Sequence, residues 1–338
     1  QLSYWEIKNW FTNVDFTIVG SGIVGLHAAL ALRDRFPSAK ILVLEKGVLP
    51  QGASTKNAGF ACFGSISEII DDLKTHTEDT VVQLIQKRYA GLQLLRKNLG
   101  DAALDLKPFG GYEVFLKEDE LFYEECLQKM PFINELLRPY FKSDVFSKQV
   151  DRFQFSDIKE YLIFNPFEAQ IDTGNMMQAL LKKAHQNDIL ILNNQNVTNF
   201  QELNVGVEVV TNGITFKTNK LIFTTNGFAA QLTQNQVQPA RAQVLITKSI
   251  PNLALKGTFH LDRGYYYFRN INDRILLGGG RNLDFEGETT TSHDTTEQIQ
   301  NRLEALLKNV ILPQQSYEIE HRWSGTMGIG THKNPIVQ

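Results

Sequence analysis

Cysteine is scarce in this sequence. Cys62 and Cys126 are the two cysteines among 338 residues, and they lie far apart in the chain. Two separated cysteines provide neither a disulfide framework nor the ligand spacing of a cysteine-bound metal. Such a composition is typical of a reducing compartment, so we expect a cytoplasmic protein.

Long hydrophobic runs are missing as well. No segment approaches the roughly 20 apolar residues that a membrane-spanning helix needs, so no transmembrane segment is predicted. Residues 1–13 lack the apolar core of a signal peptide. Because the sequence begins with Gln1, we expect its native start to have been trimmed.

Neither sign of charge is in excess. The 34 basic and 37 acidic residues leave a formal net charge of −3. Binding to nucleic acid or to an anionic membrane requires a basic patch, and no basic stripe is apparent, so we expect no nucleic-acid partner. The hydrophobic share of 42% and the charged share of 21% are ordinary for a globular enzyme, and the length allows two domains.

The strongest positive signal is a glycine motif near the start of the chain. A run of β-formers at residues 14–19 precedes Gly20, Gly22 and Gly25, and an apolar helical pattern follows directly. In a G-x-G-x-x-G turn the first glycine allows a tight turn, the second admits a pyrophosphate, and the third lets helix and strand pack closely. The helix amino terminus then faces the phosphates. This order of elements predicts a Rossmann-type dinucleotide site.

An acidic residue completes this unit. A second strand at residues 40–44 ends in Glu45, 20 residues after Gly25. A carboxylate at that distance can accept hydrogen bonds from the ribose hydroxyls, which favours FAD or NAD over NADP. The alternative is a glycine-rich turn with a structural glutamate.

The loop after Glu45 favours FAD over NAD. Residues 46–64 are rich in glycine, alanine and serine, and Ser54, Thr55 and Asn57 can donate hydrogen bonds. Two phosphate-contacting loops suit a cofactor that must also be held by a flavin ring. The alternative is a small-residue loop that packs on the sheet.

Four stretches of the chain together resemble a known family. Residues 19–32, 52–60, 172–174 and 321–328 are similar to the glycine oxidase and D-amino-acid oxidase-like FAD-dependent amine oxidoreductases. This resemblance implies an α/β fold with a Rossmann-type FAD-binding domain and an inserted α+β substrate domain that contains an antiparallel sheet. The FAD-binding domain is expected over 14–75, 151–237 and 318–338, and the substrate domain over 76–150 and 238–317.

The resemblance and the loop composition extend the set of cofactor-binding candidates. Besides the three glycines and Glu45, these are Ser54, Thr55, Lys56, Asn57, Ala58, Gly59, Thr225, Asn226, Gly227, Trp323 and Gly325. The 52–60 stretch lacks the histidine with which some relatives attach FAD, so non-covalent binding is expected. Family members also continue beyond the segment that matches 335–337, and we expect this chain to be cut there; the alternative is that cofactor binding is incomplete.

Hydrophobic periodicity predicts the remaining elements. Helices are expected over 65–107, over the polar stretch that ends near 147, from 172 onward, and over 294–309 with Asp294 or Thr295 as cap. Strands are expected over 109–119, 161–171, 238–250 and 264–281, with a turn at 272–273. Residues 189–224 predict a β-meander around Asn212-Gly213, followed by a strand at 220–228 that returns to the central sheet.

Two aromatic and basic side chains of the 264–281 strand are candidate substrate contacts. Tyr267 and Arg269 are two residues apart, so they share one face of a strand, opposite to Tyr266. Arginine binds carboxylates in a bidentate manner, so this pair could hold a substrate carboxylate or stack on an apolar substrate. The alternative is an arginine paired with a surface acid.

The stretch 323–328 departs from the carboxylate-binding members of the family. Those relatives carry an arginine for the substrate's α-carboxylate where this chain has Met327, which is apolar. The pattern is more similar to the γ-glutamylputrescine oxidase-like branch, which acts on amines. Arg269 or Arg281 could alternatively take over the carboxylate.

The resemblance implies oxidation of a C–N bond of an amine or modified amino acid, with hydride transfer to flavin N5. The sequence contains no G-x-S-x-G or H-E-x-x-H, and its histidines show no ligand spacing, so neither a nucleophile nor a metal is expected. Alternatives are a D-amino-acid dehydrogenase or glycine-oxidase-like enzyme, a flavoprotein that acts on modified tRNA, and a nicotinamide-dependent dehydrogenase. Oxygen, a quinone or another carrier would reoxidise the flavin.

Overall fold

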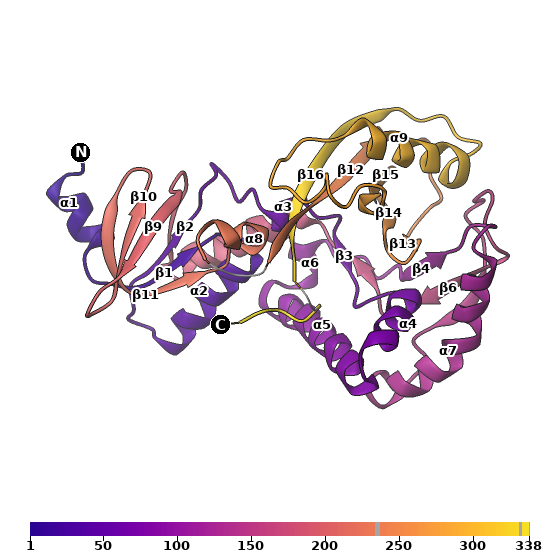
Figure 1. Cartoon of the computed structure of the whole chain (residues 1–338), viewed down its shortest axis with the longest axis horizontal. Coiled ribbons are helices and arrows are strands. Elements are labelled where there is room, and N and C mark those ends of the chain that lie inside the picture. Colours follow the sequence, from indigo (N-terminus) through magenta and orange to yellow (C-terminus); the bar gives the residue numbers. More distant parts are fainter. Residues whose placement is uncertain (234–236, 331–332, 338) are drawn as a thin grey trace. The chain divides into compact units, whose positions relative to one another are not determined.

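The chain forms two compact units. The structure, a computed structural model, describes residues 1–233, 237–330 and 333–337 (Figure 1). The first unit comprises Gln1–Asn57, Thr173–Ala240 and Thr326–His332, and the second comprises Ala58–Asp172, Arg241–Gly325 and Lys333–Gln338. The second unit contains four segments that were expected with the FAD-binding domain, residues 58–75, 151–172, 318–325 and 333–337. Residues 238–240, expected with the substrate domain, belong to the first unit. Residues 234–236, 331–332 and 338 of the expected ranges lie outside the described chain.

A six-stranded sheet forms the centre of the first unit. Its order is β8-β2-β1-β11-β10-β9, from Leu190–Leu192, Ile41–Leu44, Val14–Val19, Thr215–Phe223, Val207–Thr211 and Val197–Glu202. The first four strands are parallel, and β10 and β9 add antiparallel pairs. All four residues of β2 are buried, which explains its continuous apolar run.

Two parts of the predicted meander belong to the parallel sheet instead. Residues 190–192 form β8, which pairs in parallel with β2. The expected hairpin strand and the expected returning strand are one strand, β11, which pairs with β10 on one side and with β1 on the other. Short apolar runs do not distinguish parallel from antiparallel pairing, so the sequence alone could not separate these arrangements. The hairpin at Asn212-Gly213 is confirmed.

Helices of the first unit begin where the motifs predict. Helix α2 spans Ile23–Arg35 and packs against α8, Thr173–Gln186. Their buried residues are Gly25, Leu26, Ala29 and Leu30 in α2, and Met176, Met177, Leu180 and Ala184 in α8. Shorter elements are α1 (Tyr4–Glu6), η1 (Ile7–Phe11), α3 (Ala53–Lys56) and η2 (Asn226–Gln231).

An eight-stranded sheet forms most of the second unit. Its order is β16-β12-β15-β14-β13-β4-β6-β5, from Ile319–Ile329, Gln238–Thr247, Arg274–Gly279, Tyr266–Ile271, Thr258–Leu261, Gly111–Val114, Tyr161–Asn165 and Ser147–Val150. Four consecutive strands, from β12 to β13, pair antiparallel, and β13 pairs in parallel with β4. The antiparallel sheet and the 272–273 turn are therefore confirmed, whereas the sequence had not indicated β13.

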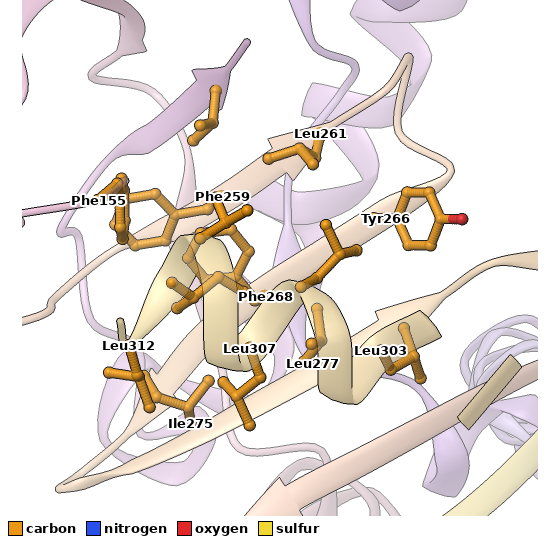
Figure 2. Packing of buried hydrophobic residues seen from close by; sticks show 14 of the residues in the cluster. Phe155, Phe259, Leu261, Tyr266, Phe268, Ile275, Leu277, Leu303, Leu307 and Leu312 are labelled. Carbon is orange, nitrogen blue, oxygen red and sulfur yellow. The ribbon is translucent and has the colours of Figure 1, made fainter. Parts of the chain in front are cut away.

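One face of this sheet packs on an apolar core (Figure 2). Phe259 of β13 stacks on Phe268 of β14 with ring centroids 4.7 Å apart. Leu303 of α9 (Glu297–Leu306) and Leu307 of η4 (Leu307–Ile311) complete the same core, and Figure 2 labels both side chains. Because side chains alternate along a strand, the residues between these positions face the other side of the sheet.

The predicted cap of helix α9 is wrong. The N-cap residue is Thr296, one or two residues later than the expected Thr295 or Asp294, and no side chain caps the helix. The backbone N–H of Thr296 instead donates to Gln243 Oε1 at 2.9 Å, and the Thr296 hydroxyl accepts from Gln243 Nε2 at 2.9 Å. A buried glutamine of β12 thus satisfies the start of the helix, a long-range contact that no local pattern reveals.

The remaining helices of the second unit form a second core. Helix α4 (Ile66–Thr75) packs against α5 (Glu78–Leu99) and α7 (Glu120–Phe141), and α6 spans Asp101–Leu104. Ser65 and Glu68 form a reciprocal capping box at the start of α4. The helices predicted between 65 and 147 are therefore confirmed. A two-stranded ladder joins β3 (Phe60–Ala61) to β7 (Ala169–Gln170). No helix among the described residues is long and apolar enough to cross a membrane.

Candidate functional site

A cavity of about 590 Å³ opens at the carboxyl ends of the parallel strands of the first unit. Val19, Leu44 and Thr224, at the ends of β1, β2 and β11, line it. The chain leaves β1 toward β2 and β8 on one side and returns as β11 on the other, so this is the point where the strand order reverses. Ligands of open α/β sheets bind at such switch points.

The glycine turn has the geometry that its spacing predicts. Gly20 has a φ of +108°, which side-chain-bearing residues rarely adopt. A Cβ on Gly25 would lie 2.0 Å from the carbonyl oxygen of Gly20, so the helix could not approach the strand as closely. Thr224 fixes the same turn, because its hydroxyl donates to the carbonyl oxygens of Val19 at 2.9 Å and Gly20 at 3.1 Å.

The amino terminus of α2 faces the cavity. Gly22 is its N-cap residue and offers no side-chain acceptor. The N–H of Ile23 donates to the hydroxyl oxygen of Ser54 at 2.9 Å, and a Cβ on Gly22 would lie 3.0 Å from that oxygen. A turn of backbone donors at the positive end of the helix dipole suits an anionic group such as a pyrophosphate.

Glu45 is held in a fixed orientation at the cavity wall. Its side chain is 6% exposed. One carboxylate oxygen accepts from the N–H and the hydroxyl of Ser21, at 3.1 and 2.8 Å, and the other accepts from the N–H of Gly47 at 3.0 Å. A carboxylate has about four acceptor positions, so one remains for a ribose hydroxyl.

Lys46 and Phe228 form a part of the wall that sequence reasoning missed. The Lys46 ammonium lies 3.4 Å from the centre of the Phe228 ring, within the range of a cation–π contact. Burial lowers the pKa of Lys46, against the opposing effect of Glu45. The two residues come from segments 182 positions apart, and no local motif connects them.

Two hydroxyl groups of the wall show that the cavity suits a polar ligand. The side-chain oxygens of Thr225 and Thr326 are buried without a hydrogen-bond partner, and both residues line the cavity. Buried hydroxyls in proteins are usually paired. Together with Glu45 and the α2 amino terminus, they fit the hydroxyls and phosphates of a dinucleotide.

The predicted cofactor-binding residues fall into three groups. Those that line the cavity are Gly20, Gly22, Glu45, Ser54, Asn57, Thr225 and Asn226. Those that shape its surroundings in the first unit are Gly25, Thr55, Lys56 and Gly227; the Thr55 hydroxyl, for example, donates to the Pro50 carbonyl at 2.7 Å. Those that belong to the second unit are Ala58, Gly59, Trp323 and Gly325.

Residues 195–198 also line the cavity and were not predicted. They follow β8, whose carboxyl end lies at the same edge of the sheet as those of β1 and β2. Residues 189–224 were expected to form a meander, so this edge position could not be deduced. Correct parallel pairing is the signal that would have found them.

Tyr267 belongs to an apolar wall of the second unit. Its ring lies edge-on to Phe60 with centroids 5.7 Å apart, and the same cluster includes Ala58 and Trp323. Burial raises the pKa of Tyr267 to about 12, so its hydroxyl stays protonated. A Cβ on Gly278 would lie 2.6 Å from the ring, so the neighbouring strand leaves space for it.

Arg269 lies on the same sheet face, beside a second cavity of about 540 Å³. Its side chain is 6% exposed, and its Nη1 donates to Gln170 Oε1 at 3.2 Å, while its Nε has no partner. Burial lowers the pKa of Arg269 to about 10, with Asp172 and Asp105 opposing that effect. The arginine is buried and incompletely hydrogen-bonded, unlike a surface ion pair.

Met327 is in the part of β16 that belongs to the first unit and is 38% exposed. A Cβ on Gly227 would lie 2.5 Å from its carbonyl oxygen, so the glycine allows the two segments to meet. The Met327 side chain provides no charge or hydrogen-bond donor for a ligand.

The sheet order, the glycine turn and the cavity define an α/β protein that binds a dinucleotide at its switch point. The chain belongs to the DAO family, described as FAD dependent oxidoreductase, whose model matches residues 15–338. The protein is accordingly an FAD-dependent oxidoreductase, and the first-unit cavity fits this cofactor. No curated protein sequence matches the chain.

Solved structures share the fold at low sequence identity. Iminodiacetate oxidase (IdaA) from Chelativorans sp. BNC1 is 18% identical, with 95% of this chain and 85% of that chain covered and a TM-score of 0.74. Glycine oxidase from Geobacillus kaustophilus is 17% identical, with 93% and 82% covered and a TM-score of 0.73. L-proline dehydrogenase from P. horikoshii is 18% identical, with 96% and 83% covered and a TM-score of 0.69.

Proposed function

We propose that this flavoenzyme oxidises the C–N bond of an amine or a modified amino acid to an imine. The observation that carries the proposal is the switch-point cavity with its glycine turn and Glu45, in a chain that belongs to this family. The structural relatives named above are an oxidase of iminodiacetate, an oxidase of glycine and a dehydrogenase of L-proline. All three names indicate compounds with a carbon–nitrogen bond beside a C–H bond.

The protein's own residues hold the cofactor without a covalent bond in this proposal. Bound FAD supplies the hydride acceptor of the reaction. The α2 amino terminus and Ser54 hold the phosphates, and Glu45 accepts hydrogen bonds from the ribose. Thr225 and Asn226 contribute further polar contacts from the end of β11.

The substrate contacts are assigned to the second unit. Tyr267 and Phe60 provide an apolar surface that excludes water and orients the C–H bond to be broken. The buried Tyr267 hydroxyl stays neutral and can donate one hydrogen bond. A neutral amine is required, because a protonated nitrogen has no lone pair to assist loss of the hydride.

Met327 and Arg269 each favour a different class of substrate. An apolar residue at 327 favours amines without an adjacent carboxylate. The unpartnered Nε of buried Arg269 favours a second candidate, an amino-acid substrate whose carboxylate is bound by this arginine. The second reading corresponds to a deaminating enzyme of the glycine-oxidase or D-amino-acid dehydrogenase type.

The test uses the purified full-length protein. We expect it to be yellow and to release FAD on denaturation. Amines and D- and L-amino acids are then mixed with it without oxygen, and bleaching of the flavin absorbance identifies substrates. If no C–N compound bleaches a flavin that dithionite does reduce, the proposed reaction is wrong.

An arginine variant separates the two classes. Arg269→Gln keeps hydrogen-bonding capacity but loses the charge, so it should raise KM for a carboxylate substrate by about tenfold to a hundredfold and leave neutral amines unchanged. Arg263→Gln is the matched control, because that exposed arginine of the second unit contacts surface acids instead. If Arg269→Gln and the unaltered protein have the same KM for every substrate, Arg269 does not bind a substrate carboxylate.

We infer the partners from the family and the compartment from the composition. The proposal includes a small-molecule substrate and an electron acceptor, either oxygen, a quinone or another carrier. The net charge of −3 gives no support to a nucleic-acid partner. The free thiols Cys62 and Cys126 suit the cytoplasm.

A further inference from the structure

Three strands of the second unit bring together Cys62, Glu168 and His260. The β3–β7 ladder pairs Phe60 with Gln170 and Ala61 with Ala169, so Cys62 and Glu168 leave the end of the ladder next to each other. His260 comes from the centre of β13. The three side chains are separated by up to 198 positions in sequence, and the proposed function uses none of them.

The three potential ligand atoms converge. The Cys62 sulfur, a Glu168 carboxylate oxygen and a His260 ring nitrogen all lie within 4.8 Å of one another. Glu168 is 1% exposed and His260 is 6% exposed. Among the residues that the structure describes, no other group of three histidine, cysteine or acidic side chains has this arrangement.

Neighbouring residues hold this arrangement in place. The Thr258 hydroxyl donates to Glu168 Oε2 at 3.0 Å, and the same oxygen lies 2.9 Å from His260 Nε2. A Cβ on Gly111 would lie 2.0 Å from a Glu168 carboxylate oxygen, so the glycine makes room for the carboxylate. Phe60 packs edge-on against the His260 ring at 5.3 Å. Such supporting contacts orient the ligands of metal sites.

We propose that Cys62, Glu168 and His260 bind one zinc-type divalent cation, with the fourth position open to water or a small ligand. Sulfur, imidazole nitrogen and carboxylate oxygen are the ligand atoms that zinc prefers, and four-coordinate sites with three protein ligands are common. A thiolate and a carboxylate neutralise the two positive charges, and this balance makes the buried site electrically neutral.

The simpler reading is an ion pair between His260 and Glu168. Burial lowers the pKa of His260, but Glu168 more than offsets this and raises it to about 9. That pair leaves the nearby thiol unexplained. Zinc binds a thiolate and a neutral ring nitrogen, so its binding must release both the thiol proton of Cys62 and the extra ring proton of a charged His260. The other cysteine, Cys126, lies in an apolar core and provides a matched comparison.

Metal content of the holoenzyme tests the site directly. The flavin-loaded protein is stripped with a chelator and titrated with Zn²⁺ in competition with a chromophoric chelator. We expect one ion per chain, and an affinity at least about tenfold lower in Cys62→Ser and His260→Gln. Cys126→Ala should bind like the unaltered protein. No bound zinc in the unaltered protein, or equal affinity in all variants, would leave the ion pair as the correct reading.

A Co²⁺ spectrum shows whether a substitution removes a metal ligand or only disturbs the fold. Co²⁺ bound by a thiolate gives a sulfur-to-metal absorption band, read as a difference spectrum against the flavin-loaded protein without metal. The band should be present in the unaltered protein and in Cys126→Ala, and absent in Cys62→Ser. Thr258→Val retains all three ligands, so it should keep the band but bind more weakly by about tenfold to a hundredfold. A band that survives Cys62→Ser would show that the metal lies elsewhere.

Discussion

At the scale of single residues, the glycines of the chain differ in what a methyl group would meet. On Gly25 it would meet the Gly20 carbonyl at 2.0 Å and the Thr224 hydroxyl at 2.7 Å, both in the cofactor turn. On Gly91, in the exposed face of α5, it would meet nothing within 4 Å. Alanine at Gly25 therefore tests a steric requirement for glycine, whereas alanine at Gly91 tests helix propensity alone.

Gly25→Ala should destabilise the protein and impair its flavin binding. The clash is with backbone and cannot be relieved by a side-chain rotation, so we expect a loss of about 3 kcal/mol in the free energy of unfolding. Chemical denaturation and the flavin absorbance of the purified variant measure both effects. Gly91→Ala should instead gain up to about 1 kcal/mol and retain its flavin. Equal behaviour of the two variants would contradict this view of the turn.

Glu113 is a buried carboxyl whose protonation is linked to stability. Burial raises its pKa to about 7, against hydrogen bonds from the hydroxyl and the N–H of Ser67. His260, opposite in the β4–β13 ladder, lowers the pKa, and Glu68 raises it. The folded protein thus holds the proton more tightly than the unfolded chain, whose pKa is near 4.5.

Stability should therefore fall as the pH rises from about 4.5 to about 7. The contribution of Glu113 is fully present below that range and lost above it, with a total of at most about 3 kcal/mol. Denaturation across this range should give a smaller slope for Glu113→Gln than for the unaltered protein. A variant with an unchanged slope would show that other groups dominate.

The sequence predicted some residues of the cavity wall and missed others. Gly20, Gly22 and Glu45 could be predicted from their spacing alone, because local geometry determines the turn and the strand that follows it. Thr326 and Phe228 were not, because their positions depend on tertiary contacts far from the motif. The roles of Tyr267, Arg269 and Met327 stay predictions.

At the scale of elements, β14 has two different faces. Tyr266 and Phe268 belong to the large apolar core, whereas Tyr267 belongs to the small cluster around Phe60. The alternation that the sequence predicted is confirmed. Substitutions at adjacent positions should therefore have different consequences.

Phe268→Ala should reduce stability, and Tyr267→Leu should reduce catalysis. The first variant removes a stacked ring from the core, at a cost of about 3–5 kcal/mol. The second retains an apolar side chain but loses the ring and hydroxyl, so we expect a slower flavin reduction by about tenfold or more with a small change in stability. Anaerobic stopped-flow reduction and thermal melts measure the pair. Normal reduction in Tyr267→Leu would remove this tyrosine from the substrate site.

Elements were predicted better than their pairing. The helices α4, α5 and α8 follow from periodicity and capping residues, which are local properties of the chain. The parallel position of β8 and the continuity of β11 depend on partners far away in sequence. Four-residue β13 is short and has no alternation long enough to detect.

At the scale of the whole molecule, two compact units share one chain and the candidate cofactor cavity belongs to the first. A ligand that binds only the folded state stabilises what it binds, by about 2.7 kcal/mol at a concentration of one hundred times Kd. Multi-unit chains also need not unfold in one step.

Removal of FAD should therefore lower the melting temperature of the first unit most. Calorimetry of the flavin-loaded and the flavin-free protein should show one transition that shifts with added FAD and one that shifts less. Hydrogen exchange assigns each transition to its residues, with β2 reporting on the first unit and β14 on the second. A uniform shift would indicate that both units unfold together.

The unusual setting of Lys46 has a practical consequence. Burial lowers the pKa of this lysine and of Lys40, and Lys46 lines the cavity whereas Lys40 does not. Amines with a lowered pKa are acylated faster near neutral pH, because more of the reactive free base is present. Covalent labelling read by peptide mass would then report occupancy: a filled cavity should shield Lys46, and Lys40 would serve as the internal standard.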